Sequence, residues 1–284
     1  MVITEQQINE YKTNGFIILK GMFDTDTVKQ IHYDTRYVFA LQFEETLNVS
    51  VEKSINLSEN EFSELMFELY KKHFKVFSNC SRQVQHLVSL HKLGVSEDLI
   101  ETLKALGLTQ PIISVRPSML MNSIYMDKGG ESGKYWRLPP HQDWYFNQGS
   151  IDSVTVWFPY VNVSQELGPL EFIPGSHLRG LQKSGEGDGF GDMTENFSDE
   201  DFVSFELSPG DAIVFFSLLV HRSGVNKTDR VRWSSQFRFN NLVEPKFIER
   251  NLPNPFMYYA VRELETPNFP SASDVENLLS LDKK

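Results

Sequence analysis

Two histidines, one aspartate and one arginine have the types and the spacing that metal-dependent oxidation requires. His141 and Asp143 are separated by one residue, and His221 lies far downstream with Arg232 eleven residues beyond it. Two imidazoles and one carboxylate can occupy one face of an Fe(II) octahedron and leave the opposite face free. The planar guanidinium of Arg232 suits a carboxylate of a compound that itself chelates the metal. The set predicts an enzyme that uses Fe(II), 2-oxoglutarate and O2.

Strands are the elements that would bring these side chains together. Residues two apart in a strand point to the same face, so a strand over residues 141–145 would aim the first two ligands at one point. Two prolines lead into this pair, and prolines are tolerated where a strand starts. The apolar run 212–220 predicts a second, buried strand that delivers His221 at its end. A His-x-Asp pair alone is common by chance, so the prediction depends on the whole set.

The second histidine ligand has a rival. His177 follows a Pro-Gly-Ser turn, where a histidine more often caps the turn than binds a metal. The ordinary alternative for His221 is a structural hydrogen bond to a backbone carbonyl. Arg232 follows His221 closely and nothing comparable follows His177, so we favour His221 as the ligand.

Residues 230–239 alternate between polar and apolar side chains except at Ser235. This pattern predicts a strand whose polar face lines a pocket and whose apolar face packs against helices. On the polar face, Arg232 would bind the distal carboxylate of 2-oxoglutarate and Ser234 would add a hydroxyl. Arg238 is a candidate contact for a substrate anion, and a structural or surface role is its alternative. A polar face in water is the alternative for the whole strand.

The fold predicted around these residues is mainly β with flanking helices. A capping box at Thr4 predicts a helix ending at Gly15, and residues 16–19 predict a strand. Helical periodicity follows over residues 24–43 and 58–106 and carries no assigned chemistry. Further strands are predicted at residues 112–125, 141–145, 153–158, 170–173, 202–207, 212–216 and 231–239. Many short strands with Pro/Gly corners favour a double-stranded β-helix (a cupin-like jelly roll) backed by an α-helical N-terminal scaffold.

We expect one oxygenase domain over residues 1–284. Residues 1–110 would form the helical scaffold, 111–245 the jelly-roll core and 246–284 a C-terminal extension. A length of 284 residues suits a single elaborated β domain, and 22 phenylalanines suit a sheet-rich core.

Composition excludes several classes of function. A net charge of −11 argues against nucleic acid or an anionic membrane as the main partner. The single cysteine, Cys80, excludes an intrachain disulfide and a cysteine-based zinc site. The chain contains no GxSxG, GxxxxGK[ST] or HExxH motif, no secretory signal and no apolar run of bilayer length. We therefore expect a cytoplasmic enzyme that acts on a small molecule.

Several segments resemble the phytanoyl-CoA dioxygenase family. They are YKTNGFIILKG (11–21), HQD (141–143), TVWFPYVNVSQELGPLEFIPGSH (155–177) and HRSGVNKTDRVR (221–232). The resemblance spans most of the chain and is loose over residues 24–110. It implies Fe(II)/2-oxoglutarate chemistry on a double-stranded β-helix, with His141, Asp143 and His221 as iron ligands and Arg232 as the 2-oxoglutarate clamp.

The same resemblance bears on other positions. It places Ser223 and Trp157 among the residues of the cosubstrate pocket, although Trp157 would equally suit a core aromatic. It places His177 at a position that is not a ligand. Relatives that halogenate replace the carboxylate ligand with a small residue, so Asp143 favours hydroxylation. Desaturation, epoxidation and ring formation use the same ligands and stay open.

The predicted function is hydroxylation of a small molecule, anionic or a natural-product intermediate, with release of succinate and CO2. Two alternatives stay open: a non-catalytic jelly-roll binding protein, and a cupin-like metalloenzyme that does not use 2-oxoglutarate. Arg232 discriminates between the two kinds of metalloenzyme, because only the 2-oxoglutarate-dependent enzyme needs it. The candidate substrate contacts are Arg116, Arg137, Trp144, Tyr145 and Arg238.

Two further expectations concern the surroundings of the site. Arg116 lies in an apolar stretch and needs a partner there, for which an internal carboxylate is favoured over the substrate. Loops 128–137 and 181–201 are predicted to close over the site, and a mobile insertion is the alternative for the second. Oligomeric state is not predicted.

Overall fold

The computed structural model describes residues 3–123, 138–183, 193 and 197–253. These ranges contain nine α-helices and four 3-10 helices, which precede or flank the strands. The α-helices are α1 (Glu5–Asn14), α2 (Thr25–Leu47), α3 (Val51–Ile55), α4 (Glu59–Lys72), α5 (Phe74–Gln83), α6 (Val88–Gly94), α7 (Glu97–Ala105), α9 (Trp144–Asn147) and α10 (Pro245–Glu249), with the 3-10 turn η1 (Val84–His86) between α5 and α6. Nowhere in these ranges is a helix long and apolar enough to cross a bilayer.

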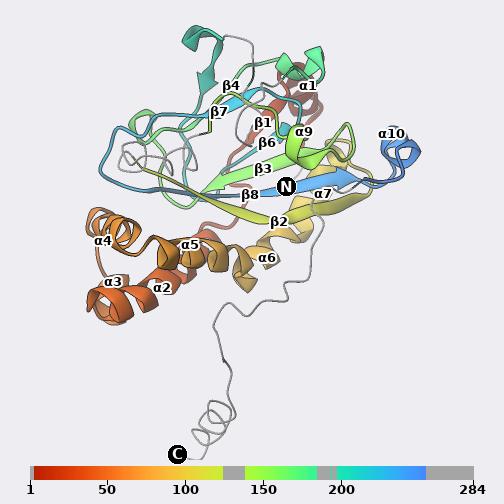
Figure 1. The fold of residues 1–284 in the computed structure, drawn as a ribbon. Helices are drawn as coiled ribbons and strands as arrows, with labels where there is room; N and C mark the ends of the chain where they lie inside the picture. Colours follow the sequence, from red (N-terminus) through yellow and green to blue (C-terminus); the bar gives the residue numbers. More distant parts are fainter. Residues whose placement is uncertain (1–2, 124–137, 184–192, 194–196, 254–284) are drawn as a thin grey trace, which may run out of the picture.

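The strands form two antiparallel sheets. They are β1 (Phe16–Leu19), β2 (Pro111–Asn122), β3 (Val154–Pro159), β4 (Leu170–Phe172), β5 (Val203–Ser204), β6 (Ala212–Phe216), β7 (His221–Ser223) and β8 (Arg232–Asn241). The larger sheet has the order β1-β6-β3-β8-β2, and the smaller one has the order β5-β4-β7. Helices α2–α6 lie on one side of the larger sheet and strands β4 and β7 on the other (Figure 1). The predicted jelly roll with flanking helices is confirmed.

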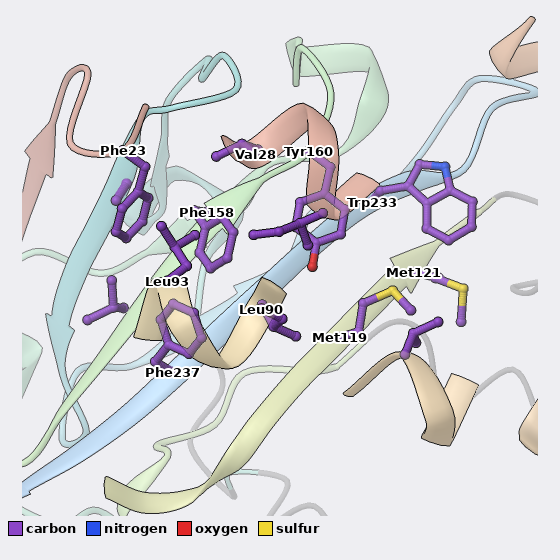
Figure 2. Close-up of a cluster of buried hydrophobic side chains, with 14 of the residues drawn as sticks. Phe23, Val28, Leu90, Leu93, Met119, Met121, Phe158, Tyr160, Trp233 and Phe237 are labelled. Carbon is purple, nitrogen blue, oxygen red and sulfur yellow. The ribbon is translucent and has the colours of Figure 1, made fainter. Parts of the chain in front are cut away.

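Alternation along the strands separates two cores. On the outer face of the larger sheet, Val156, Phe158 and Phe237 pack with the helices in one cluster. Figure 2 shows Phe158 and Phe237 beside Leu90 and Leu93 of α6. On the inner face, a second cluster lies between the two sheets, and its members are Phe16, Trp157, Val163, Leu167, Leu170, Phe172, Leu207, Ile213, Phe215 and Leu219. The inner cluster packs the smaller sheet against the larger one.

The start of the chain follows the prediction. Thr4 forms the capping box with Gln7, and Gly15 ends α1 with a left-handed backbone, φ +83°. A Cβ at this position would meet the ring of His177 and the side chain of Leu219, so the junction needs glycine for space as well as for conformation. The helix predicted over 24–43 continues to Leu47.

Three predicted strands are wrong in extent. The strand predicted over 212–220 ends as β6 at Phe216, and His221 opens β7 after a turn and does not end the same strand. Residues 141–145 contain one bridging residue, His141, and the chain then turns into α9. The backbone N–H of Trp144 donates to the carbonyl of Ser217, and that of Asn147 donates to the carbonyl of Asp143, so this backbone leaves the sheet directly after Asp143. The strand predicted over 202–207 is reduced to β5 and one bridge between Val163 and Leu207.

Candidate metal centre

Three side chains from two neighbouring segments meet between the sheets. His221 opens β7, and its backbone exchanges two hydrogen bonds with His141, at 3.0 and 3.1 Å. Asp143 lies two residues after His141 and precedes the first residue of α9. Its Oδ1 lies 3.7 Å from Nε2 of His141 and 3.9 Å from Nε2 of His221. All three residues are at most 4% exposed, and one ligand atom from each lies within 4.8 Å of the others.

Backbone carbonyls orient both imidazole rings. Nδ1 of His141 lies 2.8 Å from the carbonyl of Pro139, and Nδ1 of His221 lies 3.0 Å from that of Leu219. A carbonyl only accepts, so in the neutral ring each Nδ1 carries the hydrogen and each Nε2 keeps a lone pair. Both lone pairs face the Asp143 carboxylate, which is the arrangement that a divalent metal requires.

Asp143 is held as a carboxylate. Its Oδ2 accepts hydrogen bonds from Thr155 at 2.6 Å and from Nε of Arg238 at 3.2 Å, while its Oδ1 accepts from Nη2 of Arg238 at 3.1 Å. Burial acts to raise the pKa of Asp143, but Arg238 and the two histidines keep this pKa well below its usual value. Burial, followed by the neighbouring His141, lowers the pKa of His221 to about 3. The site therefore combines an ionised carboxylate with a neutral imidazole at ordinary pH.

The residue between the first two ligands was missed by sequence reasoning. Gln142 is fully buried and points away from the ligands. Its Nε2 donates to the carbonyls of Gly180 and Leu218, at 2.9 and 2.6 Å, and its Oε1 accepts from the backbone N–H of Gln182 at 2.8 Å. The position of an amide side chain directly between His141 and Asp143 was the one sign in the sequence of such a role. The side chain joins the ligand segment to two other loops.

Arg232 is a buried cation without an acidic partner among the residues described. It opens β8, is 1% exposed, and donates from Nη1 to the carbonyl of Gly168. Its Nε has no partner within the described ranges, and its Cζ lies 5.6 Å from the centre of a Trp157 ring. Burial lowers its pKa to about 10, so the group stays charged at neutral pH. A buried guanidinium without an acidic partner costs folding free energy unless a bound ligand supplies the missing negative charge. A carboxylate group of a ligand would supply that charge.

Two neighbouring cavities lie at the ligands and at Arg232. A space of about 10 Å³ is lined by His141, Asp143, His221 and Arg238, among others. A larger cavity of about 520 Å³ includes Arg232 in its wall. The two share lining residues, which are Leu120, Leu138 and Ser223. The small space fits a metal ion, and the shared wall leads from it towards the arginine.

Of the other residues predicted for the cosubstrate pocket, Ser223 lines both cavities. Ser223 accepts from the backbone N–H of Leu138 at 3.3 Å, and Ser234 donates to the carbonyl of Leu120 at 3.3 Å. Trp157 is fully buried in the inner core, and its Nε1 has no hydrogen-bond partner in the described part of the chain. Trp157 is thus a core aromatic that also lies beside Arg232.

The candidate substrate contacts have several different surroundings. The guanidinium of Arg238 contacts the Asp143 carboxylate and also lines the small space at the ligands. Trp144 lies beside Arg250, with 5.2 Å from the Arg250 Cζ to the ring centre, and Tyr145 donates to the carbonyl of Gln182 at 2.5 Å. Arg116 lines the larger cavity, where its buried Nε has no partner among described atoms.

Some predictions fall elsewhere or cannot be placed. His177 lies away from the ligands, where its Nε2 contacts the carbonyl of Lys12 at 3.0 Å and its ring stacks on Phe216 at 5.1 Å. Arg137, loop 128–137 and most of loop 181–201 lie outside the described residues. The internal carboxylate favoured as partner of Arg116 does not occur among the ion pairs that the described residues form.

Comparison with known proteins gives the family. The family model for phytanoyl-CoA dioxygenase (PhyH) matches residues 11–234. The human protein "Phytanoyl-CoA dioxygenase, peroxisomal" is 25% identical over 247 residues, covering 81% of this chain and 66% of the relative, just under two thirds of its length. The mouse "Phytanoyl-CoA dioxygenase domain-containing protein 1" is 23% identical over 267 residues, covering 81% of this chain and 87% of the relative.

Solved structures share the fold. The epimerase SnoN, solved with Fe3+, alpha ketoglutarate and nogalamycin RO, matches with a TM-score of 0.56 and 18% identity, over 93% of this chain and 96% of the other. EctD from S. alaskensis, solved with 2-oxoglutarate and 5-hydroxyectoine, matches with a TM-score of 0.51 and 17% identity, over 85% and 77%. The family match covers most of the sequence, and the chain belongs to the phytanoyl-CoA dioxygenase family.

Proposed function

We propose that this protein is an Fe(II)- and 2-oxoglutarate-dependent dioxygenase that hydroxylates a small molecule. The observation that carries the proposal is the presence of two features in cavities that share part of their lining. One is a buried His-Asp-His set whose imidazole Nε2 atoms face a carboxylate. The other is Arg232, a buried charge with an unpartnered Nε among described atoms.

The donor set fits the metal and the cosubstrate. His141, Asp143 and His221 would hold the iron, and Arg232 would bind the distal carboxylate of 2-oxoglutarate. Ser223 lines the cavity and Trp157 lies beside the Arg232 guanidinium, while Ser234 stays a candidate contact on the same strand as Arg232. When bound, iron and 2-oxoglutarate together supply the activation of O2, with succinate and CO2 as co-products.

The residues around this set have identifiable tasks. Arg238 and Thr155 hold the carboxylate of Asp143 in one orientation, and the carbonyls of Pro139 and Leu219 hold the rings. The near-complete burial of the ligands excludes bulk water from the reacting face. These side chains therefore orient the three ligands and keep bulk water away from them, and the bound groups supply the reactivity.

Arg232 also separates this proposal from its alternatives. A metalloenzyme that does not use 2-oxoglutarate has no need for a buried, incompletely paired cation, and the same holds for a binding protein without turnover. We further propose a cytoplasmic location, since the single cysteine, Cys80, is free and buried and fits a reducing compartment.

Succinate formation tests the proposal directly. Protein loaded with Fe(II) under anaerobic conditions would be given 2-oxoglutarate and O2, beside His141→Ala and Arg232→Met variants. We expect slow succinate release without any substrate, lost in the first variant and requiring far more 2-oxoglutarate in the second. The anaerobic sample should also show a weak visible Fe(II)–2-oxoglutarate absorption band. Absence of both the band and succinate would contradict the proposal and favour the binding protein.

A further inference from the structure

The larger cavity has a wall that the metal centre does not use. Helix α5 and turn η1 contribute Phe74, Ser78, Ser81, Arg82 and Gln85 to it. Strand β2, an edge strand of the larger sheet, contributes Arg116 and residues 118–121 on the opposite side. A volume of about 520 Å³ lies within the usual range for small-molecule sites. The helical scaffold, which carried no predicted chemistry, therefore forms part of a binding cavity.

This wall is cationic in an acidic protein. Among the residues described, the lining holds Arg82, Arg116 and Arg232 and no aspartate or glutamate, although the whole chain has a net charge of −11. Neither Arg82 nor Arg116 forms an ion pair with any described residue, and the Nε of Arg116 is buried without a partner. Arg232 is taken by the distal carboxylate in the proposed function. Two guanidinium groups then remain for another anion.

Apolar side chains make up much of the rest of the wall. Phe74, Met119, Met121, Leu120 and Leu138 line it, and the last two also line the space at the metal ligands. The part of a bound molecule that reaches the metal would therefore pass along leucine side chains. The hydroxyls of Ser78, Ser81 and Ser118 lie in the same lining as the two arginines and offer further hydrogen bonds to oxygen atoms.

We propose that the substrate is a small amphiphilic anion whose oxyanion group, a carboxylate or a phosphate, binds between Arg82 and Arg116. Its apolar body extends along Met119, Leu120 and Leu138 towards the metal centre, so that the carbon oxidised is remote from the anionic group. The assignment deepens the proposed function and rests on it for the chemistry. The anion site itself is a separate binding property.

Binding of simple amphiphiles tests the anion site without turnover. Octyl phosphate, octanoate and the neutral octan-1-ol would be titrated by calorimetry into anaerobic protein holding Fe(II) and saturating 2-oxoglutarate, which occupies Arg232. The variant Arg82→Gln/Arg116→Gln would be compared with Lys29→Gln/Lys104→Gln. The second pair removes the same number of positive charges from exposed helix positions.

We expect at least one anion to bind the wild type and the lysine variant with similar affinity, and octan-1-ol to bind roughly tenfold or more weakly. Loss of two charge-assisted contacts should weaken anion binding to the arginine variant roughly 10- to 100-fold. Which of the two anions binds more tightly identifies the oxyanion. Equal anion affinity in both variants, or equal affinity for octan-1-ol, would overturn the proposal.

Melting temperatures distinguish a loss of the anion site from a loss of folding in the arginine variants. They also test the anion site without relying on the proposed function. Two like charges without counter-ions repel, so Arg116→Gln should leave the melting temperature of the protein unchanged or raise it, while octyl phosphate raises the melting temperature of the wild type only. A large loss of stability in Arg116→Gln would show a structural arginine and overturn the assignment. If the 2-oxoglutarate band is absent but the anion still binds through Arg82 and Arg116, the proposed function fails and the site stands.

Discussion

At the scale of single residues, Arg238 is the strongest influence that keeps the Asp143 carboxylate, a proposed metal ligand, ionised. It contacts both oxygens of Asp143, which is only 1% exposed. Replacing Arg238 with Gln would leave this buried charge with Thr155 and the two neighbouring histidines as its remaining support. We expect the metal-free protein to lose on the order of 3–5 kcal/mol of unfolding free energy, the usual cost of breaking a buried pair. Urea unfolding measures this loss.

Added metal provides the control for this variant. A divalent ion compensates the charge of Asp143, so Mn(II) should stabilise Arg238→Gln more than it stabilises the wild type. The double variant Arg238→Gln/Asp143→Asn should lose less than the sum of the two single variants, because the unpaired charge is gone. Equal stabilisation of both proteins by Mn(II) would refute this role for Arg238.

Arg232 should show the opposite balance between stability and binding. Its buried guanidinium has an unpartnered Nε, and burial lowers its pKa to about 10. Replacing Arg232 with Met removes a desolvated charge, so the unfolding free energy should fall by no more than about 1 kcal/mol or should rise. Affinity for 2-oxoglutarate should fall by about 2–5 kcal/mol, or roughly 30- to several-thousand-fold, because a carboxylate loses its buried partner. Titration of the visible band measures the affinity, and an unchanged affinity would exclude Arg232 as the clamp.

At the scale of elements, Gln142 joins the ligand segment to the loops at Gly180 and Leu218. Gln142→Leu keeps the approximate shape and leaves those two carbonyls and the N–H of Gln182 without this partner. We expect metal affinity to fall about 10- to 100-fold, as for other groups that support metal ligands. Competition with a chromogenic chelator measures it. Gln148→Leu, at an exposed position on the end of α9, is a matched control and should keep its affinity.

The elements also show what the sequence could predict. The capped helix up to Gly15 and the strands holding Phe16, Trp157 and Trp233 were predictable, because caps and two-residue alternation depend on neighbours in the chain. The turn after Asp143 was not, since the backbone leaves the sheet through a hydrogen bond from Trp144 to the distant Ser217. Arg238 facing Asp143 depends likewise on the registry of separate strands.

At the scale of the whole molecule, the helices and the larger sheet share one apolar cluster, which runs from α2 through Trp233 to α6. We propose on this basis that the chain behaves as a single domain. Helix and sheet should then unfold together, and the Trp233 side chain, buried between them, should report the same transition as the helical signal. His32 lies in this contact layer, with its ring 5.6 Å from that of Trp233 and 5.8 Å from that of Tyr160.

His32 makes the stability of this layer depend on pH. Burial, followed by the charge of Arg36, lowers its pKa in the folded protein to about 3, from an ordinary value of 6.5. Above pH 6.5 neither state of the protein carries the proton, and the full stability is present. As the pH falls below 6.5 the unfolded chain binds a proton that the folded chain excludes, so this residue removes about 1.4 kcal/mol of stability per pH unit.

The variant His32→Phe isolates this contribution. Phenylalanine keeps an aromatic ring against Trp233 and Tyr160, and His32 Nε2 has no hydrogen-bond partner among the described atoms, so little is lost at pH 7.5. Nearby Glu59, whose pKa is raised chiefly by burial, acts in the opposite direction in both proteins and cancels in the comparison. Urea unfolding between pH 7.5 and 5 should therefore show a smaller loss of unfolding free energy in the variant. The slope of that free energy against pH should differ between the two proteins by the equivalent of about one bound proton. Parallel curves for the two proteins would mean that His32 takes up its proton without disturbing the layer between helices and sheet.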